Sequence, residues 1–219
     1  MKLLIKFPTR NRVKKFLNVL ETYLENLEDS STEFIVSCDL DDITMNQGYV
    51  IETINKYPNV KLFYSNNKTK IQAINANLSD VDFDILLLAS DDMIPIVKGF
   101  DTIIKKKMLE HYPDTDGVLW FNDGYQGNRL NTLCILGKKY YDRFGYIYYP
   151  EYHSVWSDNE FMDVANLLGK QTYFEDVIIQ HQHPDYGFGN RDTIHALNNN
   201  NGSHDGNLYY RRKQINFGL

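Results

Sequence analysis

Alternation between short apolar runs and amphipathic segments is the feature of this sequence that most restricts its fold. Four apolar runs of strand length are separated by three stretches in which apolar residues recur at helical spacing. The runs cover residues 2–7, 33–38, 60–64 and 83–89, and the helical stretches cover residues 12–27, 43–57 and 68–78. Strands that alternate with helices predict a mainly parallel central sheet flanked by helices. The expected fold class is therefore α/β.

Polar residues follow each of these predicted strands. Residues 9–12 come after the first strand, residues 39–42 after the second, residues 65–67 after the third, and Asp91 and Asp92 after the fourth. In parallel sheets, ligands bind at the carboxyl ends of the strands. The four clusters therefore predict one shared site at that edge of the sheet.

The second half of the chain has a less regular pattern. Its expected elements are helices over residues 99–111 and 158–168 and strands over residues 117–121, 132–136 and 172–179. A tyrosine-rich stretch, residues 140–152, suits either a core or stacking on sugars. From residue 185 onward, Asn and Gly are frequent, which predicts a mobile loop and a solvated basic segment at residues 211–213.

Composition excludes several classes of protein. A net charge of −6 argues against a protein that coats nucleic acid. The apolar run at residues 85–89 is far shorter than the roughly 20 residues that cross a bilayer. Two cysteines cannot form a disulfide framework, and no charged-then-apolar leader opens the chain. We therefore expect a cytoplasmic protein with no transmembrane segment.

Asp91 and Asp92 are the first candidates for chemistry. Two carboxylates at the end of a buried strand repel each other unless a cation compensates them. A divalent metal bound through oxygen is one remedy, and a simple helix cap or turn is the alternative. His181 and His183 are candidate metal ligands as well, because alternate residues of a strand share a face. Imidazole among carboxylates suits Mn²⁺ better than Ca²⁺.

Asp158 is a candidate base. It lies in a segment, residues 157–160, with the spacing of a capping box, in which Ser157 would cap the helix and Glu160 would reach back. On one interpretation Asp158 is only a favourable charge at a helix start. On the other, the carboxylate stays ionised and accepts a proton from a substrate hydroxyl.

Two weaker candidates are Asp39 and Asn75. Asp39 follows the second strand, where it belongs to a solvated turn or accepts hydrogen bonds from a nucleobase. Asn75 lies on the predicted helix before the fourth strand, where a surface position is the alternative. The sequence contains no Walker-type loop and no Gly-rich dinucleotide fingerprint.

Taken in order, these motifs resemble the GT-A glycosyltransferases, in a family 2-like form. Residues 8–12 (PTRNR) resemble the opening motif, and residues 70–77 (KIQAINAN) the helix before the metal site. Residues 90–92 (SDD) resemble the DxD motif, and residues 156–160 (WSDNE) the segment with the catalytic base. The resemblance covers residues 2–184. It implies one GT-A-like domain with a Rossmann-like nucleotide-sugar-binding half (1–95), an acceptor and catalytic half (96–184) and a C-terminal lid or tail (185–219).

The resemblance also implies roles for individual residues. Thr9, Arg12, Asp39, Asn75 and Asp91 would bind the nucleotide sugar. The metal, Mn²⁺ or Mg²⁺, would be held by Asp92 with His181 or His183. Asp158 would deprotonate the acceptor hydroxyl, and the sugar would be transferred with inversion.

The implied partners are a UDP- or GDP-sugar donor and a glycan, lipid or protein acceptor. The chain departs from the family pattern at Met93, which offers no third carboxylate, and in its short length. Two other interpretations stay open: a nucleotidyltransferase on a similar sheet, and a carbohydrate-binding or assembly protein without turnover.

Overall fold

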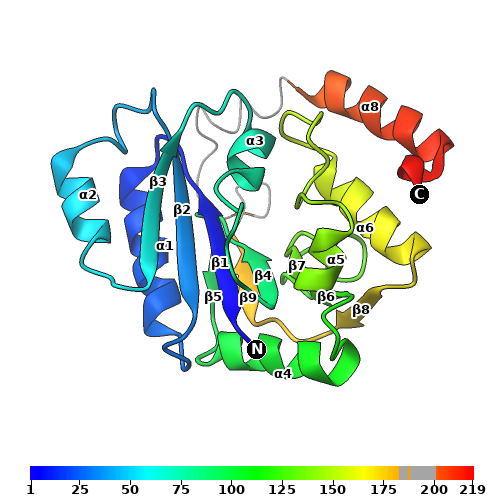
Figure 1. Cartoon of the computed structure of the whole chain (residues 1–219), viewed down its shortest axis with the longest axis horizontal. Coiled ribbons are helices and arrows are strands. Elements are labelled where there is room, and N and C mark those ends of the chain that lie inside the picture. Colours follow the sequence, from blue (N-terminus) through cyan, green and yellow to red (C-terminus); the bar gives the residue numbers. More distant parts are fainter. Residues whose placement is uncertain (183–186, 188–200) are drawn as a thin grey trace.

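The computed structural model describes residues 1–182, 187 and 201–219, and Figure 1 shows its elements. Its strands are β1 (Leu3–Pro8), β2 (Glu33–Asp39), β3 (Val60–Ser65), β4 (Ile85–Leu88), β5 (Met93–Pro95), β6 (Val118–Phe121), β7 (Ile135–Gly137), β8 (Gln171–Phe174) and β9 (Ile179–His181). Its helices are α1 (Val13–Glu25), α2 (Gly48–Ile54), α3 (Lys70–Asn75), α4 (Phe100–His111), α5 (Lys138–Asp142), α6 (Ser157–Leu167) and α8 (Gly202–Gln214). A 3-10 turn, Asn216–Gly218, follows α8. None of the described helices is both long enough and apolar enough to cross a membrane.

The central sheet has seven strands in the order β3-β2-β1-β4-β7-β6-β8. β7 is antiparallel to both of its neighbours, and the other neighbouring strands of the sheet are parallel. The predicted mainly parallel α/β sheet is confirmed. Because only β7 is reversed in this described sheet, β6 and β8 run in the same direction as β1 to β4. Their carboxyl ends therefore lie at the same edge.

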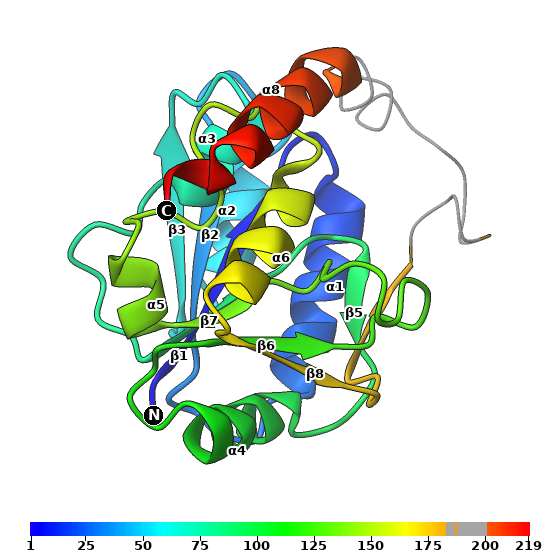
Figure 2. The same cartoon turned by 90° about the vertical axis from the view of Figure 1, so that its right-hand side faces the viewer.

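Alternate residues of the central strands divide the core into two layers. Leu3, Ile5 and Phe7 of β1 belong to the layer under α1, α2 and α4. Leu4 belongs to the opposite layer, which holds side chains of α3, α5, α6 and α8. The two views in Figures 1 and 2 show helices on both sides of the sheet.

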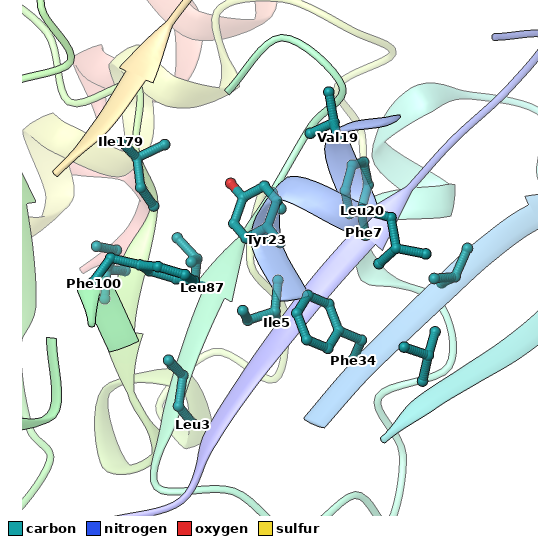
Figure 3. Packing of buried hydrophobic residues seen from close by; sticks show 14 of the residues in the cluster. Leu3, Ile5, Phe7, Val19, Leu20, Tyr23, Phe34, Leu87, Phe100 and Ile179 are labelled. Carbon is teal, nitrogen blue, oxygen red and sulfur yellow. The ribbon is translucent and has the colours of Figure 1, made fainter. Parts of the chain in front are cut away.

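Aromatic rings fill the first layer, as Figure 3 shows around Tyr23 of α1. The centroid of the Tyr23 ring lies 5.5 Å from Phe100, 5.9 Å from Phe7 and 6.3 Å from Phe34, in edge-to-face contacts. This geometry adds about 0.5–1.5 kcal/mol per pair to the gain from burial. The contacts fix α1 against β1, and so hold the connecting residues 9–12 at the carboxyl edge of the sheet.

The predicted strand over residues 172–179 is two strands in two sheets. β8 lies at one end of the central sheet, whereas β9 pairs with β5 in an antiparallel ladder that sets Met93 opposite His181. The two partners are separated by more than eighty residues along the chain. Local hydrophobic periodicity carries no information about such a pairing, so the sequence did not reveal it.

The mobile tail predicted from residue 185 onward is wrong for residues 202–219, which form α8 and the turn after it. Leu208 and Tyr209 are buried, and Arg212 donates to both carboxylate oxygens of Glu160 at 2.8–3.0 Å. Packing against α6 stabilises this helix although its Asn and Gly content disfavours it. Most of the rest of the predicted tail lies outside the described residues, and a lid role stays a prediction.

Candidate active site

A cleft of about 870 Å³ lies at the edge where β1, β2 and β4 end. Seven of the residues predicted for the site line it: Thr9, Arg12, Asp39, Asp91, Asp92, Asp158 and His181. Asn75 does not line the cleft, and His183 lies outside the described residues. The structure therefore brings the strand-end clusters together with the start of α6, as the parallel topology requires.

Asp39 lies at the end of β2 with its carboxylate buried. One of its oxygens accepts from Arg10 Nη1 at 2.7 Å, and the other accepts from Asn67 Nδ2 at 2.9 Å. Arg10 also pairs with the exposed Asp41 at 2.6 Å. The carboxylate is thus oriented at the cleft wall before any ligand binds.

Asp91 follows β4 and forms ion pairs with α1 and the loop before it. Its Oδ1 accepts from Arg12 Nη1 at 2.9 Å and lies 3.3 Å from Lys15 Nζ. Burial and the neighbouring Asp92 raise the pKa of Asp91, while Arg12 and Lys15 oppose that shift. The two cations offset the repulsion between the paired aspartates.

Asp92 faces His181 across the short β5–β9 ladder. His181 Nε2 lies 3.8 Å from Asp92 Oδ2, and its Nδ1 lies 3.4 Å from Asp123 Oδ2. Burial alone would lower the pKa of His181, but the carboxylates of Asp123 and Asp92 outweigh it and raise the pKa to about 9. Despite its burial, the pKa of Asp92 is lowered by His181 and by the Ser90 hydroxyl. The two carboxylates carry more negative charge than His181 can balance, so this group of residues favours an additional positive charge.

Asp123 is a member of this group that the sequence analysis missed. Its carboxylate is buried and accepts from Thr132 Oγ1 at 2.7 Å and from the amides of Tyr125 and Gln126 at 2.9 and 2.6 Å. The residue lies two positions after β6. Asp91 was predicted because it follows a strand whose carboxyl end lies at the ligand-binding edge of the sheet. The same argument applies to Asp123, because β6 runs parallel to β4. The direction of β6, however, depends on its pairing with β7, which was not predicted.

Thr9 has a buried hydroxyl oxygen at the cleft wall. Among the described residues, this oxygen has no hydrogen-bond partner. A buried hydroxyl without a partner costs about 1–3 kcal/mol, so a polar ligand group in the cleft would recover that energy.

Asp158 lies in the first turn of α6. The N-cap residue of this helix, Trp156, takes a left-handed conformation with φ 65°. Burial raises the pKa of the Asp158 carboxyl, and the Lys70 ammonium opposes the shift. The predicted capping box is absent: Trp156 and not Ser157 is the N-cap residue, and its side chain makes no capping hydrogen bond. Glu160 instead accepts from Tyr152 Oη at 2.8 Å and from Arg212, because burial next to these donors outweighs the local cap.

The side-chain amide of Asn75 is hydrogen-bonded to the backbone of another segment. Its Oδ1 accepts from the amides of Ile147 and Tyr148 at 2.9 and 3.2 Å, and its Nδ2 donates to the Tyr148 carbonyl at 2.7 Å. These three hydrogen bonds dock the tyrosine-rich stretch onto α3. The structure thus gives Asn75 a role in holding the cleft wall and does not place it inside the cleft.

His153, His204 and Asp205 form a further cluster at the start of α8, with ligand atoms within 4.8 Å of one another. The two imidazole rings are stacked, with centroids 4.2 Å apart and an interplanar angle of 7°. Lone pairs of parallel rings lie in separate planes and do not converge on one ion. The Asp205 oxygens already accept from backbone amides. In this arrangement the cluster joins two segments of chain and does not form a metal site.

Comparison with known proteins identifies the fold. No protein-family model and no curated sequence matches the chain. Among solved structures, the chain is similar to the mannosyltransferase PcManGT from Pyrobaculum calidifontis in complex with GDP-Man and Mn²⁺, with a TM-score of 0.66 and 14% identity over 85% of this chain and 58% of that one. It is also similar to S. aureus TarS 1-349 in complex with UDP-GlcNAc, with a TM-score of 0.65 and 18% identity over 82% of this chain and 57% of that one. These neighbours are GT-A glycosyltransferases.

The chain has the GT-A fold. A Drosophila beta-1,4-galactosyltransferase 7 mutant in complex with manganese, UDP-Gal and xylobiose matches as well, with a TM-score of 0.55 and 12% identity over 90% of this chain and 79% of that one. The resemblance read from the sequence motifs is thereby confirmed at the level of the fold. The chain spans less than three fifths of the length of PcManGT and TarS. These similarities therefore establish the fold of the chain, and they do not by themselves establish its activity.

Proposed function

We propose that this chain is a glycosyltransferase that moves a sugar from a nucleotide-diphosphate sugar to an acceptor hydroxyl with the help of a divalent metal. The observation that carries the proposal is the content of the cleft. Strand-end carboxylates, a histidine and an arginine line it together with a carboxylate at the start of a helix. The GT-A fold supports the same class of reaction, because the solved neighbours bind GDP-Man, UDP-GlcNAc or UDP-Gal.

Asp92 and His181 are the residues that would hold the metal ion, with His183 as a further candidate. A carboxylate oxygen and an imidazole nitrogen suit Mn²⁺, and Mg²⁺ is the alternative. The site fits a cation, because the carboxylates of Asp92 and Asp123 both face His181, and a metal ion that displaced the imidazole proton would take over the positive charge between them. A bound metal ion supplies a Lewis acid that stabilises the negative charge of the departing diphosphate.

The residues after β1 and β2 would bind the nucleotide. Arg12 carries a positive charge into the cleft beside Asp91, which suits a diphosphate or a ribose hydroxyl. Thr9 lines the same wall, and its hydroxyl, which has no partner among the described residues, would form a hydrogen bond with a polar group of the donor. Asp39, which Arg10 and Asn67 hold in place, would accept hydrogen bonds from the edge of the nucleobase.

Asp158 would act as the base that deprotonates the acceptor hydroxyl. Burial raises its pKa above that of an ordinary aspartate, which strengthens it as a proton acceptor. Direct attack of the activated hydroxyl on the anomeric carbon would transfer the sugar with inversion. Tyr148 and Trp156 also line the cleft and offer rings that suit a sugar, so a glycan, a glycolipid or a glycoprotein is the acceptor class we expect.

The test is a donor panel. The purified chain is incubated with UDP- and GDP-sugars and Mn²⁺, and the release of nucleoside diphosphate is measured with and without EDTA. We expect metal-dependent release from at least one donor. Binding without release from any donor would instead identify a carbohydrate-binding or assembly protein. Release of pyrophosphate from a nucleoside triphosphate and a sugar phosphate would identify a nucleotidyltransferase.

A further inference from the structure

One loop carries the chain from the tyrosine-rich stretch into α6. It consists of residues 153–156, and it leads directly to Ser157 and Asp158, the first residues of the helix. All four of its residues line the cleft. The conformation of this loop therefore decides where the Asp158 carboxylate lies relative to anything bound in the cleft.

Asp205, in the first turn of α8, binds three successive amides of this loop. Its Oδ1 accepts from His153 N at 3.0 Å, and its Oδ2 accepts from Ser154 N at 2.8 Å and from Val155 N at 2.9 Å. The Asp205 side chain is fully buried. Hydrogen bonds from amides to a buried carboxylate are charge-assisted and are about twice as strong as neutral ones.

The ring of His204 completes the contact from the solvent side. His204 Nδ1 lies 2.9 Å from Asp205 Oδ1, and the His204 ring stacks on that of His153. Both oxygens of the carboxylate are thus engaged, and the loop is held from its backbone and from one of its side chains.

The end of the loop is held by close packing. Trp156 has φ 65°, a conformation that costs a non-glycine residue of order 1 kcal/mol and persists only when the surroundings impose it. Gly206 leaves room for the Trp156 ring, because an added Cβ there would lie only 3.3 Å from Trp156 Nε1. The Trp156 ring also packs against the rings of Tyr209 and Tyr210.

We propose that Asp205 is a positioning residue for the proposed base: by binding the amides of residues 153–155, it fixes the loop that places Asp158 in the cleft. The proposal rests on the proposed function. It assigns α8, a segment more than forty residues further along the chain, a direct part in the geometry of the site. Misplacement of a reacting group by about 1 Å costs on the order of 100-fold in rate.

Asp163 provides a matched control. This carboxylate also joins α6 to α8, because its Oδ2 accepts from Tyr209 Oη at 2.6 Å and from Lys213 Nζ at 2.8 Å. Within the part of the chain that the structure describes, Asp163 forms no hydrogen bond or ion pair with residues 153–156. Asp163→Asn therefore weakens the contact between α6 and α8 while the hydrogen bonds of Asp205 to residues 153–155 stay in place.

The experiment compares Asp205→Asn with Asp163→Asn in the full chain. An amide cannot accept from three amides as a carboxylate does, because one of its ends is a donor. For Asp205→Asn we expect kcat to fall about 10- to 100-fold, with the donor KM within about twofold. Hydrogen exchange in peptides that cover residues 153–159 should become faster. For Asp163→Asn we expect a lower Tm with kcat within about twofold and with unchanged exchange in that loop.

The outcomes separate this proposal from the proposed function. If the wild type transfers sugar and Asp205→Asn keeps its kcat, or if Asp163→Asn loses as much, the positioning role is overturned. A wild type that is inactive with every donor overturns the proposed function. In that case hydrogen exchange alone tests whether Asp205 holds the loop. Unchanged exchange in residues 153–159 of Asp205→Asn would show that it does not, and faster exchange confined to that loop would show that it does.

Discussion

The carboxylates at the ends of β2 and β4 and the carboxylate at the start of α6 line the same cleft in different electrostatic states. Asp39, Asp91 and Asp92 each contact a cationic side chain: Arg10, Arg12 and His181, respectively. Asp158 has no ion pair within the part of the chain that the structure describes, and the amide of Asn159 is the donor to its carboxylate. We call these the paired side and the unpaired side of the cleft.

The difference teaches what each side is suited to do. A cation beside a carboxylate favours its ionised form: His181 lowers the pKa of Asp92, and Arg12 and Lys15 oppose the rise that burial causes in the pKa of Asp91. Carboxylates held in this way suit the binding of a metal and a diphosphate. A buried carboxylate without a cation partner has a raised pKa and gives up less energy when it takes a proton. The paired side is thus suited to hold the donor, and the unpaired side to remove a proton from the acceptor.

Asp158→Asn tests the unpaired side and has the largest expected effect. General-base catalysis contributes about 100- to 10,000-fold to a rate. We expect the transfer rate to fall by that factor while donor affinity stays within about twofold of the wild type, as measured by steady-state kinetics and titration calorimetry. Asp142→Asn, at an exposed position on α5, is the control and should change neither quantity. Loss of donor binding in Asp158→Asn would contradict the division of the cleft.

Asp92→Asn tests the paired side. The amide removes the charge that His181 faces at 3.8 Å and weakens a ligand of the proposed metal. We expect transfer to fall about 100- to 1,000-fold, because a bound metal is worth several kcal/mol in such reactions. EDTA should reduce the wild type to the level of the variant and have little further effect on the variant itself. A wild type that is insensitive to EDTA would rule out metal dependence.

Arg212→Met tests an ion pair that does not line the cleft, for comparison with the ion pairs of the paired side. Arg212 forms a bidentate pair with the buried Glu160, and its guanidinium lies 3.3 Å from the centroid of the Tyr149 ring. Removing one partner of a buried pair costs about 3 kcal/mol or more. We expect a Tm lower by roughly 10 °C for a chain of this size, measured by calorimetry.

Arg211→Met is the matched control for that change, because Arg211 is exposed on the same helix. Its Tm should stay within about 2 °C of the wild type, as is usual for surface substitutions. Equal losses in the two variants would show that the net charge of α8, and not the buried pair, sets its stability.

Asp39→Asn has the smallest expected effect. The substitution keeps the shape of the side chain but removes the charge that Arg10 contacts at 2.7 Å. We expect donor affinity to fall about tenfold, the value of one lost hydrogen bond to a charged group. Asp41→Asn removes the other, largely exposed partner of Arg10 and should change affinity less. Calorimetry with the free nucleoside diphosphate distinguishes the two, and an unchanged affinity in Asp39→Asn would remove its role in binding the base.

The two halves of the chain also differ in how much the sequence reveals. The α/β class and the meeting of Asp39, Asp91 and Asp92 at one edge follow from local periodicity, because parallel strands bring their ends together whatever the details of packing. The position of Asp158 at a helix start follows from equally local signals. These features depend on neighbours in the sequence, and they were predictable.

The features that were missed depend on contacts between distant segments. The pairing of β5 with β9 was not predicted, although the family resemblance had placed Asp92 with His181 or His183 at one metal site, and the reversed strand β7 brings Asp123 to the same place. Asn75 was expected in the cleft, but its side-chain amide is hydrogen-bonded to the backbone of residues 147–148. α8 contains residues that disfavour a helix and is stabilised by Glu160 and Asp163 of α6. None of these has a signature in local hydrophobic periodicity.

The most direct test of the central claim is the titration of UDP- and GDP-sugars into the chain by calorimetry with Mn²⁺ present. Wild type, Asp92→Asn and Asp158→Asn are compared under the same conditions. The account predicts that the wild type and Asp158→Asn bind one donor with similar affinity, and that Asp92→Asn binds it at least tenfold more weakly. Equal binding by all three variants, or binding that Asp158→Asn loses and Asp92→Asn retains, would contradict the account.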